Sequence, residues 1–374
     1  MKKIFFLAYL LLTSPLGVGG LFAQTKLPDT GISGVYEVIH AVKDAQYAIK
    51  YFGEYGFKVI DSSSVSAAEA LKIYGVNSAL KTYRLQNGGI DSHGLLRLWV
   101  WEKSLGDGVG YHIPETIGSR MAVMKTSDIM RLYDVYSTLR DKKEKWLPTE
   151  PIPDDLFGLN KPEKVNFFQR PVLVRENAIY GEFFTHVFFQ RYGYEIPGYG
   201  TINPDAPLKT SEFTHHDFFI KAESMEAINY ISNALGMQAE KEPEVDGDFL
   251  KGPKRVFMMA EGYSHLYQGF VSPNNICGKL KFFIARSPKP DASAHQRVGE
   301  LGITMHSFYT PKLDMVFDSI KKDTRLKASV ILKNELGDRC FTFSDQAGVT
   351  WQIIEKKSTK NVPVSKLEIK FTNN

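Results

Sequence analysis

A pattern that recurs four times along the chain is the feature that most limits how this sequence can fold. In each copy a short alternating strand leads to a polar residue, and apolar residues at helical spacing follow. In the first copy these are Val35–Val42, Asp44, Ala45, Ala48, Ile49 and Phe52. With Asp44, Asp128, Glu223 and Thr310 as equivalent points, the copies begin 84, 95 and 87 residues apart. The chain is therefore predicted to hold four similar units.

Runs typical of strands follow each predicted helix. They are residues 57–60, 79–85 and 95–101 in the first unit, 172–174 and 179–190 in the second, 256–260 and 280–285 in the third, and 328–332, 339–343 and 349–354 in the fourth. Each unit thus reads as one strand, one helix and two or three further strands (βαβββ), which is an α+β pattern. A single unit of this kind leaves an apolar sheet face uncovered, so the units are expected to pair.

Two pairs of units imply two domains. The expected linker is residues 194–207, where Gly198, Gly200 and three prolines interrupt any regular pattern. The first pair of units is then predicted to span residues 34–193, and the second pair residues 208–356. Residues 357–374 form a polar tail that is expected to fray.

The N-terminus has the pattern of a secretory signal peptide. Lys2 and Lys3 precede the apolar run Ile4–Leu12, and mostly small and apolar residues continue to Ala23, after which cleavage is expected. The apolar run is too short to cross about 30 Å of hydrocarbon. The protein is therefore predicted to be periplasmic or secreted, without stable membrane insertion once residues 1–23 are removed. An uncleaved N-terminal anchor is the alternative.

Charge and cysteine content limit the partners. Removal of the signal peptide takes away two lysines and lowers the formal charge from +4 to +2, which gives no electrostatic case for nucleic acid binding. Cys277 and Cys340 are the two cysteines. They could form a disulfide in an oxidising compartment or stay as two buried thiols. Two cysteines are too few for a cysteine-ligated metal cluster.

Three segments carry a family resemblance. Tyr51-Phe52 with Tyr55-Gly-Phe57, and residues 229–237 (NYISNALGM), are similar to a helix end of that family, and residues 343–355 (FSDQAGVTWQIIE) are similar to its final hairpin. With these motifs and the repeat, the sequence resembles the vicinal oxygen chelate superfamily. This superfamily includes glyoxalase lyases, extradiol dioxygenases and antibiotic-resistance proteins. The resemblance covers roughly residues 34–356 and implies glyoxalase-type modules.

The resemblance also implies a divalent metal (Zn, Fe, Mn or Ni) inside a cupped sheet, held by His or Glu side chains of first and last strands and acting as a Lewis acid. The family's first-strand position falls on Glu37, Met121, His216 and Ile303, and its last-strand position on Leu98, Phe282 and Gln352; the second unit's last strand offers Glu182 and His186. His216 and Gln352 are therefore the predicted metal ligands, across one cavity of the second half. No residue is assigned a catalytic role.

Three functional hypotheses follow from the resemblance. The first is a metal-dependent lyase, isomerase or dioxygenase that acts on a small oxygenated molecule. The second is a metal-free protein whose aromatic cup binds a small molecule without catalysis. The third is an exported structural or partner-binding protein. Fold alone does not choose between them, so the side chains that converge in each cup have to decide.

Overall fold

The computed structural model describes residues 27–154, 172–240, 256–258, 265–274, 276–357 and 370–371. The predicted signal peptide, residues 1–23, and most of the predicted polar tail lie outside these residues. Within the described ranges, no helix combines the length and the apolar character that a membrane crossing requires.

The first two units follow the predicted order of a strand, a helix and further strands, with three elements that were not predicted: the helix α2 in unit 1 and the short strands β6 and β7 in unit 2. Unit 1 consists of β1 (Glu37–Ala41), α1 (Ala45–Glu54), β2 (Phe57–Val65), α2 (Ala67–Tyr74), β3 (Leu80–Asn87) and β4 (Leu95–Trp101). Unit 2 consists of β5 (Arg120–Thr126), α3 (Ile129–Asp141), β6 (Trp146–Pro148), β7 (Ile152–Asp154), β8 (Leu173–Gly181) and β9 (Thr185–Tyr192). Asp44 begins α1 by accepting hydrogen bonds from the backbone of Gln46 and Tyr47, as residues at this helix position commonly do.

The last two units repeat this order. Unit 3 consists of β11 (Thr210–Ile220), the 3-10 helix η1 (Met225–Ile228), α4 (Tyr230–Asn233), β12 (Gln238–Ala239), β13 (His265–Val271) and β14 (Lys279–Ala285). Unit 4, after the 3-10 helix η2 (Ser293–His295), consists of β15 (Gly302–Thr310), α6 (Leu313–Lys322), β16 (Lys327–Ala328), β17 (Leu332–Lys333), β18 (Arg339–Ser344) and β19 (Thr350–Glu355). Residues 256–258 form a helical turn instead of the predicted strand. The α+β class and the four units are confirmed.

Hydrogen bonding joins the units in an order that differs from their order in the chain. Strand β1 pairs antiparallel with β15, which places units 1 and 4 in one nine-stranded sheet. Strand β5 pairs antiparallel with β11, which places units 2 and 3 in a second nine-stranded sheet. A short extra pair, β10 (Tyr194–Glu195) with β20 (Lys370–Phe371), lies outside both sheets. Each sheet therefore crosses the predicted division at residues 194–207.

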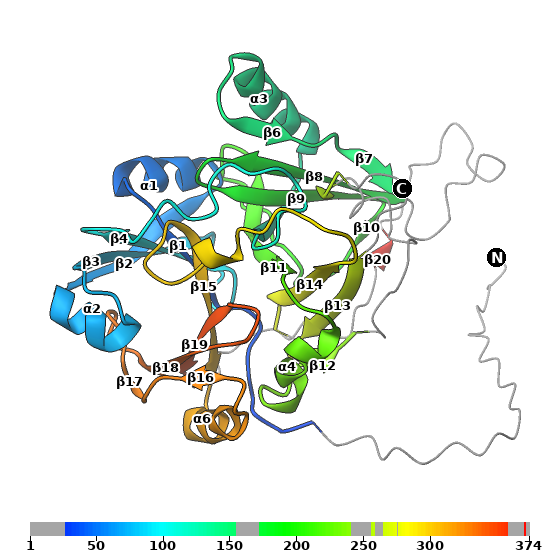
Figure 1. Ribbon diagram of the computed structural model, residues 1–374. Helices are drawn as coiled ribbons and strands as arrows, with labels where there is room; N and C mark the ends of the chain where they lie inside the picture. Colours follow the sequence, from blue (N-terminus) through cyan, green and yellow to red (C-terminus); the bar gives the residue numbers. More distant parts are fainter. Residues whose placement is uncertain are drawn as a thin grey trace, which may run out of the picture.

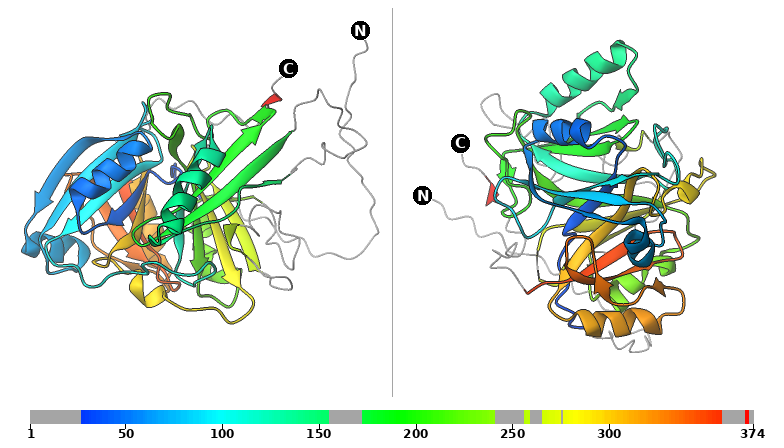
Figure 2. Two further views of the ribbon diagram at one scale, coloured as in Figure 1. Left: turned by 90° about the horizontal axis from the view of Figure 1, so that it is seen from above. Right: turned by 90° about the vertical axis from the view of Figure 1, so that its left-hand side faces the viewer.

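Packing of the helices follows the chain order instead. One hydrophobic core joins units 1 and 2 through residues such as Phe52, Leu96, Leu132 and Phe188. A second core joins units 3 and 4 through residues such as Ile231, Phe282, Val316 and Trp351. Figure 1 shows the result, with α1 and α3 at one end of the molecule and α4 and α6 at the other, and the views in Figure 2 agree. The domain boundary at residues 194–207 stays a prediction.

The other face of each sheet carries several charged side chains. We call the face of the unit 1 and unit 4 sheet that bears Glu37, Arg97 and Gln352 the first cup. We call the face of the unit 2 and unit 3 sheet that bears Asp217 and Lys281 the second cup. In the first cup, side chains of β4 and β19 meet although β1 and β15 lie between these strands.

Candidate functional site

A buried ion pair occupies the centre of the first cup. Glu37 on β1 accepts hydrogen bonds from Arg97 on β4, from Arg84 Nε at 2.6 Å and from Ser307 Oγ at 2.8 Å. Both Glu37 and Arg97 are fully buried. Burial alone would raise the pKa of Glu37, but the two guanidinium groups outweigh it and lower the pKa to about 2. Glu37 is therefore ionised at neutral pH and held by two cations.

The remaining oxygens of the first cup also contact the two arginines. Arg97 Nη1 donates to Gln352 Oε1 at 2.9 Å and to Glu335 Oε1 at 3.3 Å. Glu335 lies in the turn between β17 and β18, and it also accepts hydrogen bonds from Trp99 Nε1 at 2.9 Å and from the Tyr74 hydroxyl. At the rim, Arg84 Nη2 donates to Asp338 Oδ2 at 2.9 Å. Glu37, Gln352 and Glu335 therefore each pair with Arg97, although Nε of Arg97 has no hydrogen-bond partner among the described residues.

These contacts decide whether the first cup fits a divalent metal. Glu37 and Gln352 would have to supply oxygen ligands, yet both oxygens already bind the guanidinium of Arg97. A second cation in contact with the same oxygens would be repelled strongly at such distances in a buried site. The residues of the first cup therefore do not fit a metal ion.

The two predicted metal ligands do not face one cavity. Gln352 on β19 points into the first cup, where it contacts Arg97. His216 lies on β11 of the other sheet and points away from both cups, because its ring packs 6.2 Å from the Phe213 ring and 5.1 Å from the His306 ring. Neither ring nitrogen of His216 has a hydrogen-bond partner among the described residues. Burial lowers the pKa of His216 to about 3, so the ring is neutral.

The other positions implied by the resemblance are divided among several environments. Leu98 and Ile303 belong to the core of units 1 and 2, and Phe282 to the core of units 3 and 4. His186 packs among aromatic rings between the sheets, and Glu182 pairs with Lys145 at the surface. Met121 does line the second cup.

The second cup holds a carboxyl group that the sequence analysis did not assign. Asp217 follows His216 on β11, so it faces the opposite side of the strand, and its Cα is paired with that of Met121. The Oδ1 atom of Asp217 is buried and has no hydrogen-bond partner in the described ranges. Burial raises the pKa of Asp217 to about 6, although the nearby Lys281 opposes this shift.

Two further charged groups face Asp217. Burial also raises the pKa of Glu176 on β8, and Lys281 on β14 is again the largest opposing influence. Lys281 forms no ion pair within 4.0 Å among the described residues, whereas Lys279, two positions earlier, pairs with Glu240. Asp217, Glu176 and Lys281 therefore influence one another electrostatically without direct contact.

Aromatic rings surround this charged group. Phe257 packs 5.7 Å from Phe219 and 4.6 Å from Phe283, measured between ring centroids. Toward the other end, the Tyr199 hydroxyl and His215 Nδ1 share a hydrogen bond of 2.7 Å. The second cup thus combines a largely aromatic wall with a few polar groups, which is the usual composition of a small-molecule site.

A metal does not fit the second cup either. Across the part of the chain that the structure describes, no three His, Cys, Asp or Glu side chains converge as a metal site requires. Lys281 also interacts electrostatically with both carboxyl groups, and its positive charge would oppose a metal cation there. Neither cup therefore assembles the ligand set that the family resemblance implies.

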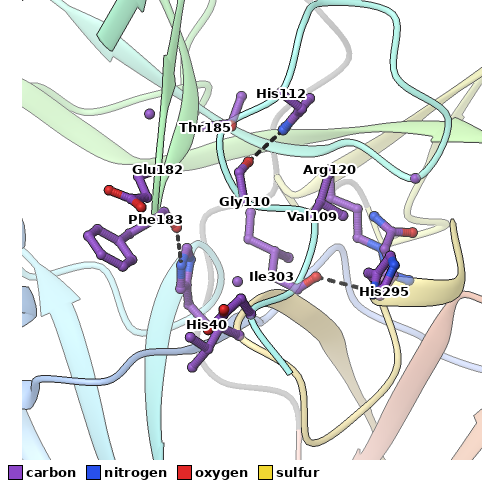
Figure 3. Close-up of a pocket in the computed structure, with 16 residues that line it drawn as sticks. His40, Val109, Gly110, His112, Arg120, Glu182, Phe183, Thr185, His295 and Ile303 are labelled. Carbon is purple, nitrogen blue, oxygen red and sulfur yellow. Dashed lines mark hydrogen bonds between the residues drawn. The ribbon is translucent and has the colours of Figure 1, made fainter. Parts of the chain in front are cut away.

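A separate pocket lies where the ends of the two sheets meet (Figure 3). It encloses about 480 Å³, part of it open to solvent, and its lining includes His40, His112, Arg120 and His295. His40 Nε2 shares a 2.7 Å hydrogen bond with the Phe183 carbonyl, and Arg120 Nη1 donates to the Ile303 carbonyl at 3.2 Å. His40 joins β1 to the turn between β8 and β9, and Arg120 joins β5 to β15, so both side chains contribute to the packing of the two sheets.

The two cysteines are free and buried. Cys277 precedes β14 in the sheet of the second cup, and Cys340 lies on β18 in the sheet of the first cup. Of the two alternatives left open by the sequence, the structure has two buried thiols.

Comparison with known proteins gives the fold a name. No family model matches the sequence, and the search of curated proteins returned no match. Glyoxalase I from Zea mays superimposes with a TM-score of 0.50 and 12% identity over 86% of this chain and 92% of that chain. A putative dioxygenase from Bacillus subtilis superimposes with a TM-score of 0.50 and 10% identity over 87% and 86%. This chain therefore has the fold of the vicinal oxygen chelate superfamily, built from four glyoxalase-type units.

Proposed function

We propose that this protein binds a small molecule in the second cup and needs no metal ion to do so. The observation that carries the proposal is the buried Oδ1 atom of Asp217, which has no hydrogen-bond partner among the described residues and lies near the aromatic wall. The half-buried Glu176 and Lys281 interact with Asp217 electrostatically. Buried polar groups are nearly always hydrogen-bonded in folded proteins. An unpaired one costs about 1–3 kcal/mol, so its retention points to a ligand that completes the contacts.

The chemistry of the cup limits the ligand. Asp217 and Glu176 can accept hydrogen bonds when ionised or donate them when protonated, and a pKa of about 6 leaves Asp217 able to do either near neutral pH. Lys281 offers a hydrogen-bond donor and a positive charge. The rings of Phe219, Phe257 and Phe283 favour an apolar or aromatic part. A small aromatic molecule with a polar or acidic substituent fits these groups.

A thermal-shift screen of aromatic acids, phenols and aromatic amines would test the proposal. Compounds that raise the melting temperature are then titrated into the parent and into Asp217→Asn, Lys281→Met and Asp338→Asn. We expect the first two substitutions to weaken binding about tenfold or more, because each removes a charged group that would contact the ligand. Asp338→Asn lies at the rim of the first cup and should leave the affinity unchanged. A ligand affinity that is unchanged by both Asp217→Asn and Lys281→Met would contradict the proposal.

We also propose that the protein is exported and that residues 1–23 are removed. The support is the order of Lys2, Lys3 and the apolar run Ile4–Leu12 at the N-terminus. Expression with the native leader in a Gram-negative host, followed by fractionation and N-terminal sequencing, tests this. A periplasmic product that starts at Gln24 is the expected result, and a product with an intact Met1 in the cytoplasm would refute it.

A further inference from the structure

We propose that the guanidinium of Arg97 takes the place of a metal cation in the first cup, so that this cup is a latent divalent-metal site. The first cup is not the cup proposed above to bind a small molecule. In it, three oxygen-bearing side chains converge on one guanidinium. Glu37 comes from β1, Gln352 from β19 and Glu335 from the turn between β17 and β18, and each accepts a hydrogen bond from Arg97.

The convergence is a property of the fold around Arg97 and not of one flexible loop. Glu37 and Gln352 lie on regular strands on either side of β15, and Ser307 of β15 donates to Glu37 at 2.8 Å. Both side chains are fully buried, and Glu335 is nearly so. Carboxylate and amide oxygens from separate strands that meet around one positive charge are the arrangement that also binds divalent cations.

Charge balance supports the same reading. The first cup contains the carboxylates of Glu37, Glu335 and Asp338 and the guanidinium groups of Arg84 and Arg97. Without Arg97, the buried carboxylates of Glu37 and Glu335 would face the guanidinium of Arg84 alone, with Asp338 adding its charge at the half-exposed rim. A buried excess of negative charge needs a counter-charge. Arg97 provides this positive charge, which a bound cation would also supply.

The experiment replaces the guanidinium by a metal ligand. Four proteins are dialysed against Zn²⁺, and their zinc content is measured beside a circular dichroism spectrum: the parent, Arg97→His, Arg97→His with Glu37→Gln, and Gln352→His. Arg97→His should hold one more zinc ion per chain than the parent. The added Glu37→Gln should remove that ion, because the strongest oxygen ligand is lost.

Gln352→His is the matched control, since it also adds a histidine to the cup but keeps Arg97. The proposal requires that it take up no additional zinc, because the guanidinium still fills the position. A folded Arg97→His protein with no zinc beyond the parent would overturn the proposal, and so would additional zinc in Gln352→His. If Arg97→His fails to fold even when zinc is present during refolding, the zinc content of Gln352→His decides the question. More zinc than in the parent would then overturn the proposal, and a zinc content equal to that of the parent is the result the proposal requires.

Discussion

The first and second cups are built by the same strand topology but differ in how their charges are paired. In the first cup, Glu37 contacts two guanidinium groups and Ser307, and Arg97 contacts three acidic or amide side chains. In the second cup, Asp217 and Lys281 face each other without contact. The central carboxylate of the first cup pairs with groups of units 1 and 4, whereas Oδ1 of Asp217 in the second cup has no hydrogen-bond partner among the described residues. This difference is the reason that we place the proposed binding site in the second cup.

The contrast extends to the pKa values of the central carboxyl groups. Glu37 has a pKa lowered to about 2 because two arginines outweigh its burial, and Asp217 has a pKa raised to about 6 because burial outweighs Lys281. The first carboxyl group stabilises the fold only while it is ionised. The second is easier to bury when it is protonated.

The largest expected change in stability follows from removing the ion pair between Glu37 and Arg97 at the centre of the first cup. Glu37→Gln leaves Arg97 and Arg84 without their shared carboxylate in a buried site, so we expect the free energy of unfolding at pH 7 to fall by about 3–5 kcal/mol. Urea denaturation measures this. A loss below about 1 kcal/mol would show that the pair is not the structural centre of the first cup.

The next largest effect is expected for His216, which lies on the face of β11 opposite to Asp217. His216, behind Asp217, has a folded-state pKa of about 3, lowered mainly by burial. In the unfolded chain the imidazole of His216 therefore takes up a proton near pH 6.5, whereas in the folded protein it stays neutral until about pH 3. The free energy of unfolding falls as the pH drops from about 6.5 toward 3. Between pH 7 and 4.5 the parent should lose about 2–3 kcal/mol more than His216→Phe. The exposed His295→Asn control should follow the parent, and an identical acid profile for His216→Phe would refute the assignment.

The substitution Asp217→Asn should change the free energy of unfolding by less, and its effect should appear at high pH and not at low pH. Because the folded-state pKa of Asp217 is raised, its ionised form destabilises the fold above about pH 6, and this cost disappears as the pH falls toward 4. We expect Asp217→Asn to raise the free energy of unfolding by about 1–2 kcal/mol at pH 7.5 and to have little effect at pH 4. Denaturation at the two pH values tests this. A pH-independent loss of stability would mean that Asp217 has a structural partner.

The smallest effect concerns the thiols of the two sheets. Because Cys277 and Cys340 are free and lie in different sheets, a reductant should leave the melting temperature unchanged. A disulfide would contribute about 2–4 kcal/mol to stability, and its reduction would lower the melting temperature visibly. Such a drop would contradict the placement of the cysteines in opposite sheets.

The four units could be predicted from the sequence because their signals are local. Strand alternation and helical spacing each extend over about ten residues, and the cap at Asp44 lies at the predicted point. The pairing of units could not be predicted in the same way. It depends on contacts of β1 with β15 and of β5 with β11, and nothing in one unit's local pattern specifies which distant strand it will join.

The candidate site was harder to predict because one residue of register reverses the face of a strand. The position in unit 3 was counted back from Glu223, but the residue that begins the helical turn is Ser224. The count therefore selected His216, whereas the structure places Asp217 in the cup. Arg97 left a signal that the sequence analysis did not use: a charged residue in the otherwise apolar strand Leu95–Trp101. A charge in that setting requires a buried partner, and Glu37 on the neighbouring strand was available.

Methionine methyl NMR tests the central difference between the cups most directly. Met121 lines the second cup, and Met305 packs beside Ile39 and Trp99 in the sheet of the first cup. With ¹³C-methyl methionine and assignments from Met121→Leu and Met305→Leu, compounds from the thermal-shift screen are titrated into the parent. The account predicts that the Met121 signal shifts at saturation while the Met305 signal stays in place. A shift of the Met305 signal without a shift of the Met121 signal would place the binding site in the first cup and would contradict the proposal.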